Sequence, residues 1–218
     1  MKKLSCVDGV IETQQTNQSG DSGAIPTSTH QFKIEEGRFK DFSDLLKKWH
    51  YKSSKMGGGI SHNLVLKYKD KVYGGIVIGK MRHTKNYDEN AVELRRMVLH
   101  EDCPKNTASY FLSKTIWWLK KNTDVSIVLT FADLTVGHKG TCYKAANFEF
   151  VRETPPTIHV LWKGLRYHPR SLTIERPYSY KLREAVKTGE AKIEKGKPKL
   201  LYQYKIKRNS QFNEEAKK

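Results

Sequence analysis

The chain has 218 residues and a formal net charge of +17, from 40 Lys and Arg against 23 Asp and Glu. This length suits one domain with appendages, and the three scattered cysteines, Cys6, Cys103 and Cys142, argue against a disulfide framework or a structural zinc site. No apolar run reaches the ~20 residues of a membrane span, so we expect a cytoplasmic protein without a membrane partner. The charge indicates a polyanionic partner, with nucleic acid favoured over a merely solubilising surface.

The first half of the chain reads as a disordered segment followed by strands and one helix. Residues 1–29 are poor in apolar residues, and we predict that they are disordered. A short strand is expected at 30–34. The apolar residues between 40 and 50 recur at helical spacing and predict an amphipathic helix. A loop at 51–59 then leads into a predicted hairpin of strands 61–69 and 72–80.

The second half continues with alternating strands and helices. We predict a strand at 91–100, a helix that runs from the loop at 103–109 to residue 121, and a buried strand at 125–131. A short helix at 141–147 and strands at 148–152 and 158–163 follow. Beyond residue 165 the pattern weakens, although 175–191 has partly helical character and 200–206 has the pattern of a late strand.

This order predicts an α/β (α+β) fold with a mixed, mostly antiparallel sheet and helices on both faces. It resembles the order of the GNAT acyltransferases from the first strand to about residue 164. We therefore expect a GNAT-like catalytic core at 30–164 and a basic C-terminal extension at 165–218. The extension has 15 Lys and Arg against 6 Asp and Glu, a net +9, interleaved with tyrosines. Such a composition suits contact with DNA phosphates and bases.

The start of the helix after residue 103 is a candidate anion site. Free backbone N–H groups at a helix start attract phosphate, and in GNAT enzymes the equivalent turn holds a coenzyme pyrophosphate. The turn here is not glycine-rich, so the donor stays open between acetyl-CoA and a glycyl-type donor, and an ordinary capped helix start is the alternative. The candidate cofactor-binding residues are Lys105, Asn106, Thr107, Ala108 and Ser109.

Three segments together resemble the Mom family of phage DNA-modification proteins: ELRRMVL at 93–99, KNTASYFLS at 105–113 and FADLTVGHKGTCYKAANF at 131–148. The similarity is strongest over 72–164 and extends to about 206. It implies a transferase that converts adenine in double-stranded DNA to an N6-carbamoylmethyl (glycinamide-type) adenine in the host cytoplasm. That product shields phage DNA from host restriction enzymes.

Within the resemblance, the family's motif positions fall on Arg95, Ser109, Asp133 and Tyr143. Asp133 would accept the adenine N6 proton or orient the amine, and its structural alternative is a turn cap. Tyr143, the counterpart of the tyrosine in the GNAT element Y-x-x-x-G-F, would protonate the leaving group or orient the donor, and its alternative is core packing. Arg95 would bind donor or phosphate, and we expect Arg96 on the opposite face of the strand.

The remaining candidates lie around these motifs. His138 is a possible second base or DNA contact, in a loop. A metal site from His50, Asp133 and His138 is not demanded by their spacing, and we assign no metal. The expected substrate-binding residues are His50, Tyr51, Arg96 and Lys139. Two other functions remain open: an acetyl-CoA-dependent N-acetyltransferase, and a non-catalytic basic DNA-binding protein with a GNAT-like core.

Overall fold

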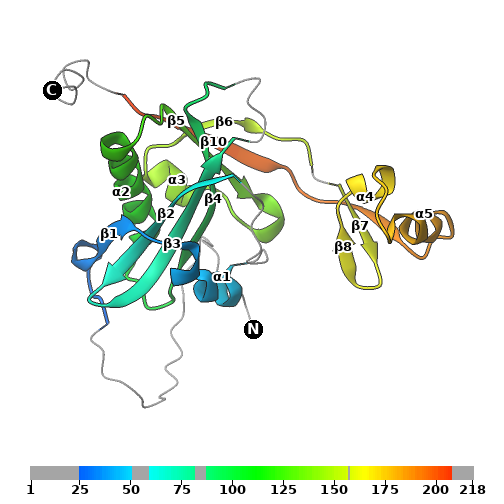
Figure 1. Cartoon of the computed structure of the whole chain (residues 1–218), viewed down its shortest axis with the longest axis horizontal. Coiled ribbons are helices and arrows are strands. Elements are labelled where there is room, and N and C mark those ends of the chain that lie inside the picture. The colour runs from blue at the N-terminus through cyan, green and yellow to red at the C-terminus, as the bar shows by residue number, and fades with distance from the viewer. Residues whose placement is uncertain (1–24, 51–58, 82–86, 157, 208–218) are drawn as a thin grey trace, which may run out of the picture.

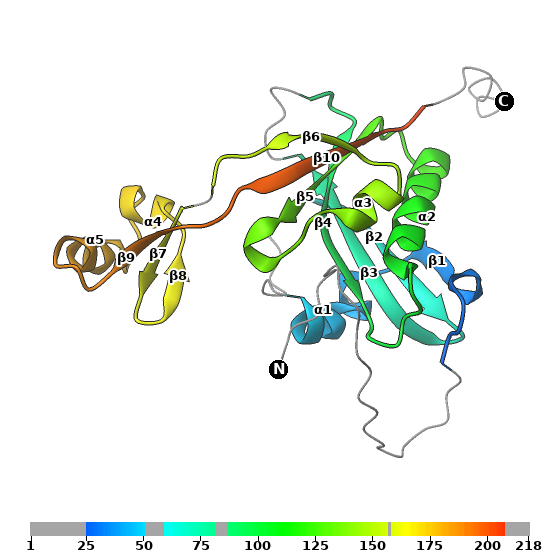
Figure 2. The ribbon, with the colours of Figure 1, turned by 180° about the vertical axis from the view of Figure 1, so that it is seen from behind.

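A computed structural model describes residues 25–50, 59–81, 87–156 and 158–207. Most of the predicted disordered segment, and the loop expected at 51–59 except Gly59, lie outside these residues. The described chain forms a large sheet with helices packed against it and a smaller module to one side, seen from opposite sides in Figures 1 and 2.

The large sheet has seven strands in the order β1-β2-β3-β4-β5-β10-β6. All neighbours are antiparallel except β4 and β5, which are parallel. The predicted mixed, mostly antiparallel sheet is therefore confirmed. The strands are β1 Lys33–Glu36, β2 Ile60–Tyr68, β3 Lys71–Lys80, β4 Ala91–Leu99, β5 Ile127–Asp133, β6 Glu149–Glu153 and β10 Lys199–Lys205.

Helices cover both faces of this sheet, as the sequence predicted. α2 (Thr107–Asn122) and α3 (Thr141–Ala145) lie on one face, which we call the α2 face, and α1 (Ser43–Trp49) lies on the other, the α1 face. The alternation of strand side chains divides the apolar residues between two cores. Leu64, Ile76 and Leu94 pack under α2. Val65, Val77 and Val98 pack under α1.

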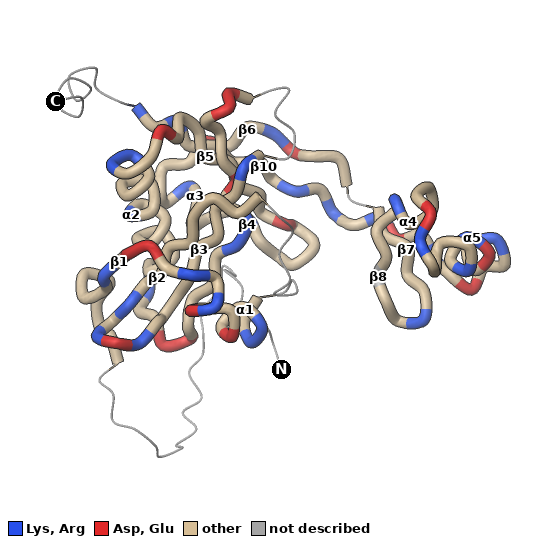
Figure 3. The backbone as a smooth tube through the Cα atoms, in the orientation of Figure 1, with Lys and Arg blue, Asp and Glu red and all other residues tan. Residues whose placement is uncertain are grey.

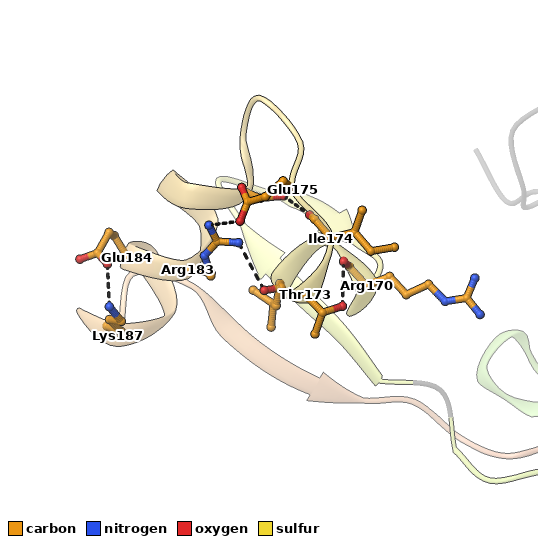
Figure 4. Close-up of polar contacts among 9 residues, drawn as sticks. Arg170, Thr173, Ile174, Glu175, Arg183, Glu184 and Lys187 are labelled. Atoms are coloured by element: carbon orange, nitrogen blue, oxygen red, sulfur yellow. Dashed lines mark hydrogen bonds and ion pairs between the residues drawn. The ribbon is translucent and has the colours of Figure 1, made fainter.

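A separate module is inserted between β6 and β10. It contains a three-stranded sheet in the order β8-β7-β9, and it has its own core around Val160, Leu182 and Ala185. Its helices pack together through polar contacts that include an ion pair of 2.7 Å between Arg183 and Glu175 (Figure 4). The elements are β7 Ile158–Trp162, β8 Leu165–Tyr167, α4 Arg170–Thr173, α5 Ser179–Lys187 and β9 Lys192–Lys195.

The module changes the predicted division of the chain. The strand predicted at 158–163 is β7 and belongs to the small sheet, whereas the late strand predicted at 200–206 is β10 and lies inside the large sheet. β10 pairs with β5 along its whole length, from Lys199 opposite Asp133 to Lys205 opposite Ile127. Residue 164 is therefore not a sheet boundary, because the chain leaves the large sheet after β6 and returns to it with β10.

Within the described residues, no helix combines the length and the apolar character that crossing a membrane would require.

Candidate active site

The parallel strands β4 and β5 part half-way along their length. They pair only from Ala91 opposite Ile127 to Leu94 opposite Thr130. Beyond that point β4 continues against β3, and β5 continues against β10. The hydroxyl of Thr130, a buried residue, donates to the Leu94 carbonyl over 3.3 Å at the last paired position. The two strands thus open a gap at their carboxyl ends, where open α/β sheets commonly bind ligands.

A β-bulge in β4 begins where the strands part. Val77 of β3 lies opposite Arg96 and Ile78 lies opposite Leu94, so Arg95 is the extra residue of the bulge. Directly paired residues share a face of the sheet. Val77 belongs to the α1-face core, so its partner Arg96 also lies on that face.

Arg95 lies on the α1 face too. Its guanidinium packs over Gly79, where a Cβ atom would lie 2.4 Å from the Arg95 Cζ. Gly79 is next to Ile78, which points to the α2 face, so alternation directs Gly79 to the α1 face. The expectation that Arg95 and Arg96 face opposite sides is therefore wrong, because the bulge interrupts the alternation.

Arg95 is held firmly. Its side chain is only 5% exposed, its Nη2 donates to the Lys80 carbonyl over 2.8 Å, and its Nε lies 3.9 Å from a Glu93 carboxylate oxygen. The Arg96 Nη1 donates to the Arg95 carbonyl over 3.1 Å. Two guanidinium groups therefore lie on the α1 face of the sheet, and the Arg95 group is turned toward β3, where Lys80 and Glu93 hold it.

Asp133 ends β5 on the same α1 face. Its neighbour Ala132 belongs to the α2-face core, so Asp133 points the other way. The residue is 8% exposed. One carboxylate oxygen accepts the Thr135 N–H over 3.0 Å and caps the 3-10 helix η4 (Leu134–Val136), and the other lies 3.8 Å from the Lys199 Nζ. Asp133 is thus a turn cap through one carboxylate oxygen, and its other oxygen faces the Lys199 ammonium.

Tyr143 lies on the opposite side of the sheet from Asp133. It extends from α3 into the α2-face core, with its ring 5.5 Å from that of Tyr202 and 5.8 Å from that of Phe148. The structure does not bring the Tyr143 and Asp133 side chains together on one face.

The loop from η4 to α3 contains the predicted His138 and Lys139. The His138 N–H donates to the Asp133 carbonyl over 3.2 Å, and the Lys139 carbonyl accepts the Tyr202 hydroxyl over 3.1 Å. Gly140 has a φ of +78°, and a Cβ there would lie 2.4 Å from the Tyr202 ring. Tyr202 of β10 therefore packs against this loop and holds it in place. The Lys139 side chain is exposed.

The start of α2 has the features of an anion site. Asn106 precedes the helix with a φ of 68°, a left-handed conformation that glycine usually supplies and asparagine tolerates. The backbone N–H groups of Ala108 and Ser109 have no acceptor among the described residues. The predicted role of the two hydroxyls as phosphate donors is not supported, because Thr107 donates to the Pro104 carbonyl (2.6 Å) and Ser109 to the Asn106 carbonyl (3.0 Å). The candidate anion-binding groups at this helix start are therefore the two backbone N–H groups and the exposed Lys105 side chain.

The other predicted candidates are more peripheral. His50 is buried on the α1 face directly after α1, where its N–H donates to the Leu46 carbonyl over 3.0 Å. Tyr51 lies outside the described residues. Burial raises the pKa of the Cys103 thiol to about 12, so this cysteine before α2 is a neutral thiol and not a nucleophile. In the described part of the chain, no three His, Cys, Asp or Glu side chains are grouped so that they could hold a metal ion.

The sequence alone did not identify three residues that contribute to the site. Lys199 meets Asp133 only because β10 pairs with β5, and no local pattern predicts a partner so distant in the chain. Gly79 makes room for Arg95. Thr130, a hydroxyl inside an apolar run, was the one visible signal of a polar contact at the strand gap.

The comparisons with solved structures identify the fold. The ribosomal-protein-S5-alanine acetyltransferase from Vibrio fischeri aligns with a TM-score of 0.51 and 9% identity, over 81% of this chain and 93% of that one. The ribosomal-protein-S18-alanine N-acetyltransferase from Escherichia coli aligns with a TM-score of 0.50 and 10% identity, over 83% and 97%. At such identities the likeness shows the fold alone, and it confirms the predicted GNAT-like fold.

The sequence comparisons are more specific. The Methylcarbamoylase mom of Escherichia phage Mu is 36% identical over 78 residues, which are 35% of this chain and 32% of that protein. The alignment thus spans about a third of that relative. The pattern of the Mom protein family matches residues 31–216, which include both sheets and the strand gap. The chain therefore belongs to the Mom protein family.

Proposed function

We propose that the protein is a transferase that converts adenine N6 in phage DNA to a carbamoylmethyl adenine and so protects that DNA from host restriction. The observation that carries the proposal is the match to the Mom protein family over residues 31–216. The name of the phage Mu relative, a methylcarbamoylase, supports the same reaction class. The net charge of +17 suits a DNA substrate.

The chemistry requires three things of the site. Adenine N6 is a poor nucleophile because its lone pair is delocalised into the ring, so the enzyme must position the amine, accept its proton and bind an activated donor. Asp133 is the best candidate to receive the proton, because it ends a buried strand beside the gap and keeps one carboxylate oxygen outside the cap. Arg95 and Arg96 are candidates to bind anionic groups of the donor or the DNA on the same face.

The start of α2 is the candidate donor site. The N–H groups of Ala108 and Ser109 and the side chain of Lys105 would hold a pyrophosphate such as that of an acyl-coenzyme A. Such a donor would supply an activated carbonyl. The proposed product has a methylene group on N6, whereas plain acyl transfer would attach a carbonyl there. A glycyl-type donor supplies the two carbons and the nitrogen of the carbamoylmethyl group, which acetyl-CoA does not. Attack of N6 on the glycyl carbonyl would still form an N6–carbonyl bond, so an isomerisation of the glycyl adduct must follow to place the methylene group on N6.

The DNA must present its adenine outside the stack. A pocket cannot approach N6 for transfer while the base is paired, so we expect the nucleotide to be turned out of the duplex. That step costs a few kcal/mol, which phosphate contacts and stacking offset. A second base role for His138 and a contact from Lys139 belong to the same proposal, since both lie in the loop that follows η4.

Mass spectrometry of nucleosides from cells that express the protein tests the proposal. We expect deoxyadenosine carrying a carbamoylmethyl mass addition, and plasmid DNA resistant to a restriction enzyme with adenine in its site. An N-acetyltransferase would leave the DNA unchanged and acetylate amines instead, and a non-catalytic DNA-binding protein would modify neither. Unmodified adenine in the phage-infected native host would overturn the proposal.

A further inference from the structure

The inserted module and η4 border a cleft, and none of the predicted site residues that the structure describes lines it. Its volume is about 410 Å³, and it lies between η4 and the small sheet. A hydrogen bond links its two sides, because the Lys197 backbone N–H donates to the Thr135 side-chain hydroxyl oxygen over 3.2 Å. The lining residues are Thr135, His159, Glu194, Lys195, Gly196 and Lys197.

The cleft adjoins the candidate proton acceptor. Thr135, which lines it, donates its N–H to Asp133 over 3.0 Å. On the other side, the chain that leaves the cleft enters β10 at Lys199, whose Nζ lies 3.8 Å from the second Asp133 oxygen. A ligand in the cleft would therefore contact Thr135, the hydrogen-bond partner of Asp133, while the Asp133 side chain itself does not line the cleft.

The chemistry of the lining selects the kind of ligand. Lysines occupy every second position along the segment from β9 into β10, at 195, 197 and 199 (Figure 3). Lys195 and Lys197 are exposed, and neither forms an ion pair with any described residue. His159 adds a third nitrogen group. Among the described lining residues, Glu194 is the one carboxylate and none has a large apolar side chain. Such a lining suits a phosphate-bearing polar ligand and not an apolar protein segment.

We propose that this cleft binds the target nucleotide of the DNA substrate, with its phosphates on Lys195 and Lys197 and its base directed toward Asp133. The inference rests on the proposed function and adds to it the place where the extruded nucleotide is held. The volume falls in the range of small-ligand sites, ~300 to 1,000 Å³, and accommodates one base with its sugar and phosphate. The Glu194 carboxylate would accept a hydrogen bond from an amino group of a base.

A matched pair of double variants tests the cleft. Lys195→Ala with Lys197→Ala removes two charges inside it. Lys181→Ala with Lys192→Ala removes two exposed charges elsewhere on the module, from residues that form no ion pair with a described residue. Binding of a mixed-sequence DNA duplex is measured against salt. We expect the cleft variant to flatten the plot of log K against log salt by about 0.7 to 0.9 for each lost phosphate contact, and the control to keep the wild-type slope.

A photo-cross-link places the nucleotide directly. A duplex with 4-thiothymidine beside an adenine is irradiated with wild-type protein, and mass spectrometry identifies the attached peptide. We expect attachment within residues 192–199 or at His159, and loss of it in the cleft variant at DNA concentrations that saturate binding. Thermal unfolding controls for folding, which exposed Lys→Ala changes should leave intact.

The outcomes separate this inference from the proposed function. Equal slopes for both variants, or cross-links only outside the cleft, would overturn the nucleotide site even if the wild type modifies adenine. Cross-linking in the cleft by a wild type that leaves adenine unmodified would support the site and overturn the proposed function. A wild type that does not bind duplex DNA would overturn both.

Discussion

At the residue scale, Asp133 combines a structural and a proposed chemical role. Its carboxylate caps η4 through the Thr135 N–H and approaches the Lys199 ammonium. Both contacts orient the carboxylate, which lies at the end of β5 where β5 has left β4. A capping residue is not thereby excluded from catalysis, because one oxygen serves the cap while the other faces the Lys199 ammonium at 3.8 Å.

Asp133→Asn separates these two roles. Asn keeps the size and the cap, so we expect folding to survive, whereas the proton acceptor is lost and adenine modification should fall by about 100-fold or more. DNA binding should not weaken, since the change removes a negative charge near a polyanion. Nucleoside mass spectrometry measures the modification.

Asp133→Ala provides the control for capping. It should cost about 1 kcal/mol in the free energy of unfolding, measured by denaturant, because the Thr135 N–H loses its acceptor. A folded Asp133→Asn protein that modifies adenine at the wild-type rate would assign the proton acceptor elsewhere, with His138 as the next candidate.

At the scale of elements, the bulge in β4 determines how the site is built. It turns Arg95 and Arg96 to one face and begins where β4 leaves β5. Gly79 on β3 belongs to the same arrangement, because glycine has no Cβ atom and so leaves the space that the Arg95 guanidinium occupies. β3 therefore supports the site although it contributes no reactive group.

Gly79→Ala tests this arrangement. The added Cβ would lie 2.4 Å from the Arg95 Cζ and 2.6 Å from the Gly59 carbonyl oxygen, so Arg95 must move. We expect the rate of adenine modification to fall as far as in Arg95→Ala. The double variant Gly79→Ala with Arg95→Ala should be only slightly slower than either single variant, since both changes remove the same contact. The free energy of unfolding should fall by roughly 1 to 3 kcal/mol.

Gly75→Ala is the matched control on the same strand. Its Cβ would meet the Phe42 ring at 2.1 Å, far closer than packing allows, but it does not touch Arg95. This variant should lose stability while its folded fraction keeps the wild-type modification rate. Equal loss of rate in both variants would show that overpacking of β3, and not displacement of Arg95, impairs the enzyme.

At the scale of the whole molecule, the module is an insertion in a hairpin. Thr154, directly after β6, and Lys199, at the start of β10, are hydrogen-bonded neighbours, with 2.8 Å between the Thr154 N and the Lys199 O. The residues between them, 155–198, have 10 Lys and Arg against 4 Asp and Glu. The basic part of the C-terminal quarter is thus divided between this module and a strand of the large sheet.

Replacement of residues 155–198 by Asn-Gly should close β6 and β10 into a two-residue hairpin. We expect a folded protein, because the module has its own core and the large sheet keeps all seven strands. Its affinity for duplex DNA should fall and its salt dependence flatten by at least about 1.4, the effect of two lost phosphate contacts. Circular dichroism and salt-dependent binding measure these results.

Truncation after Lys163 is the contrasting variant. It removes β10 from between β5 and β6, so it should unfold the large sheet and not merely weaken DNA binding. An Asn-Gly variant that binds DNA with the wild-type slope would show that the DNA-binding charge lies on the large-sheet domain.

The sequence by itself determined the local elements and the family. Helical periodicity located α1 and α2, alternation located the β2–β3 hairpin, and the Mom resemblance at 93–148 anticipated the family and the GNAT-like fold. These features depend on neighbours within a few residues, or on short motifs that can be recognised directly in the sequence. The candidate roles of Asp133 and Tyr143 came from the same source, and they stay predictions.

Only the tertiary structure decided which distant segments meet. The pairing of β10 with β5, the bulge that turns both arginines to one face, and the cleft between the module and η4 depend on strand registers set by contacts across the whole chain. A strand's own sequence indicates that it pairs, but the competing partners differ by small packing energies that no local pattern records. For this reason the sequence did not indicate that Lys199, 66 residues after Asp133, lies beside it; the strand order of the sheet did.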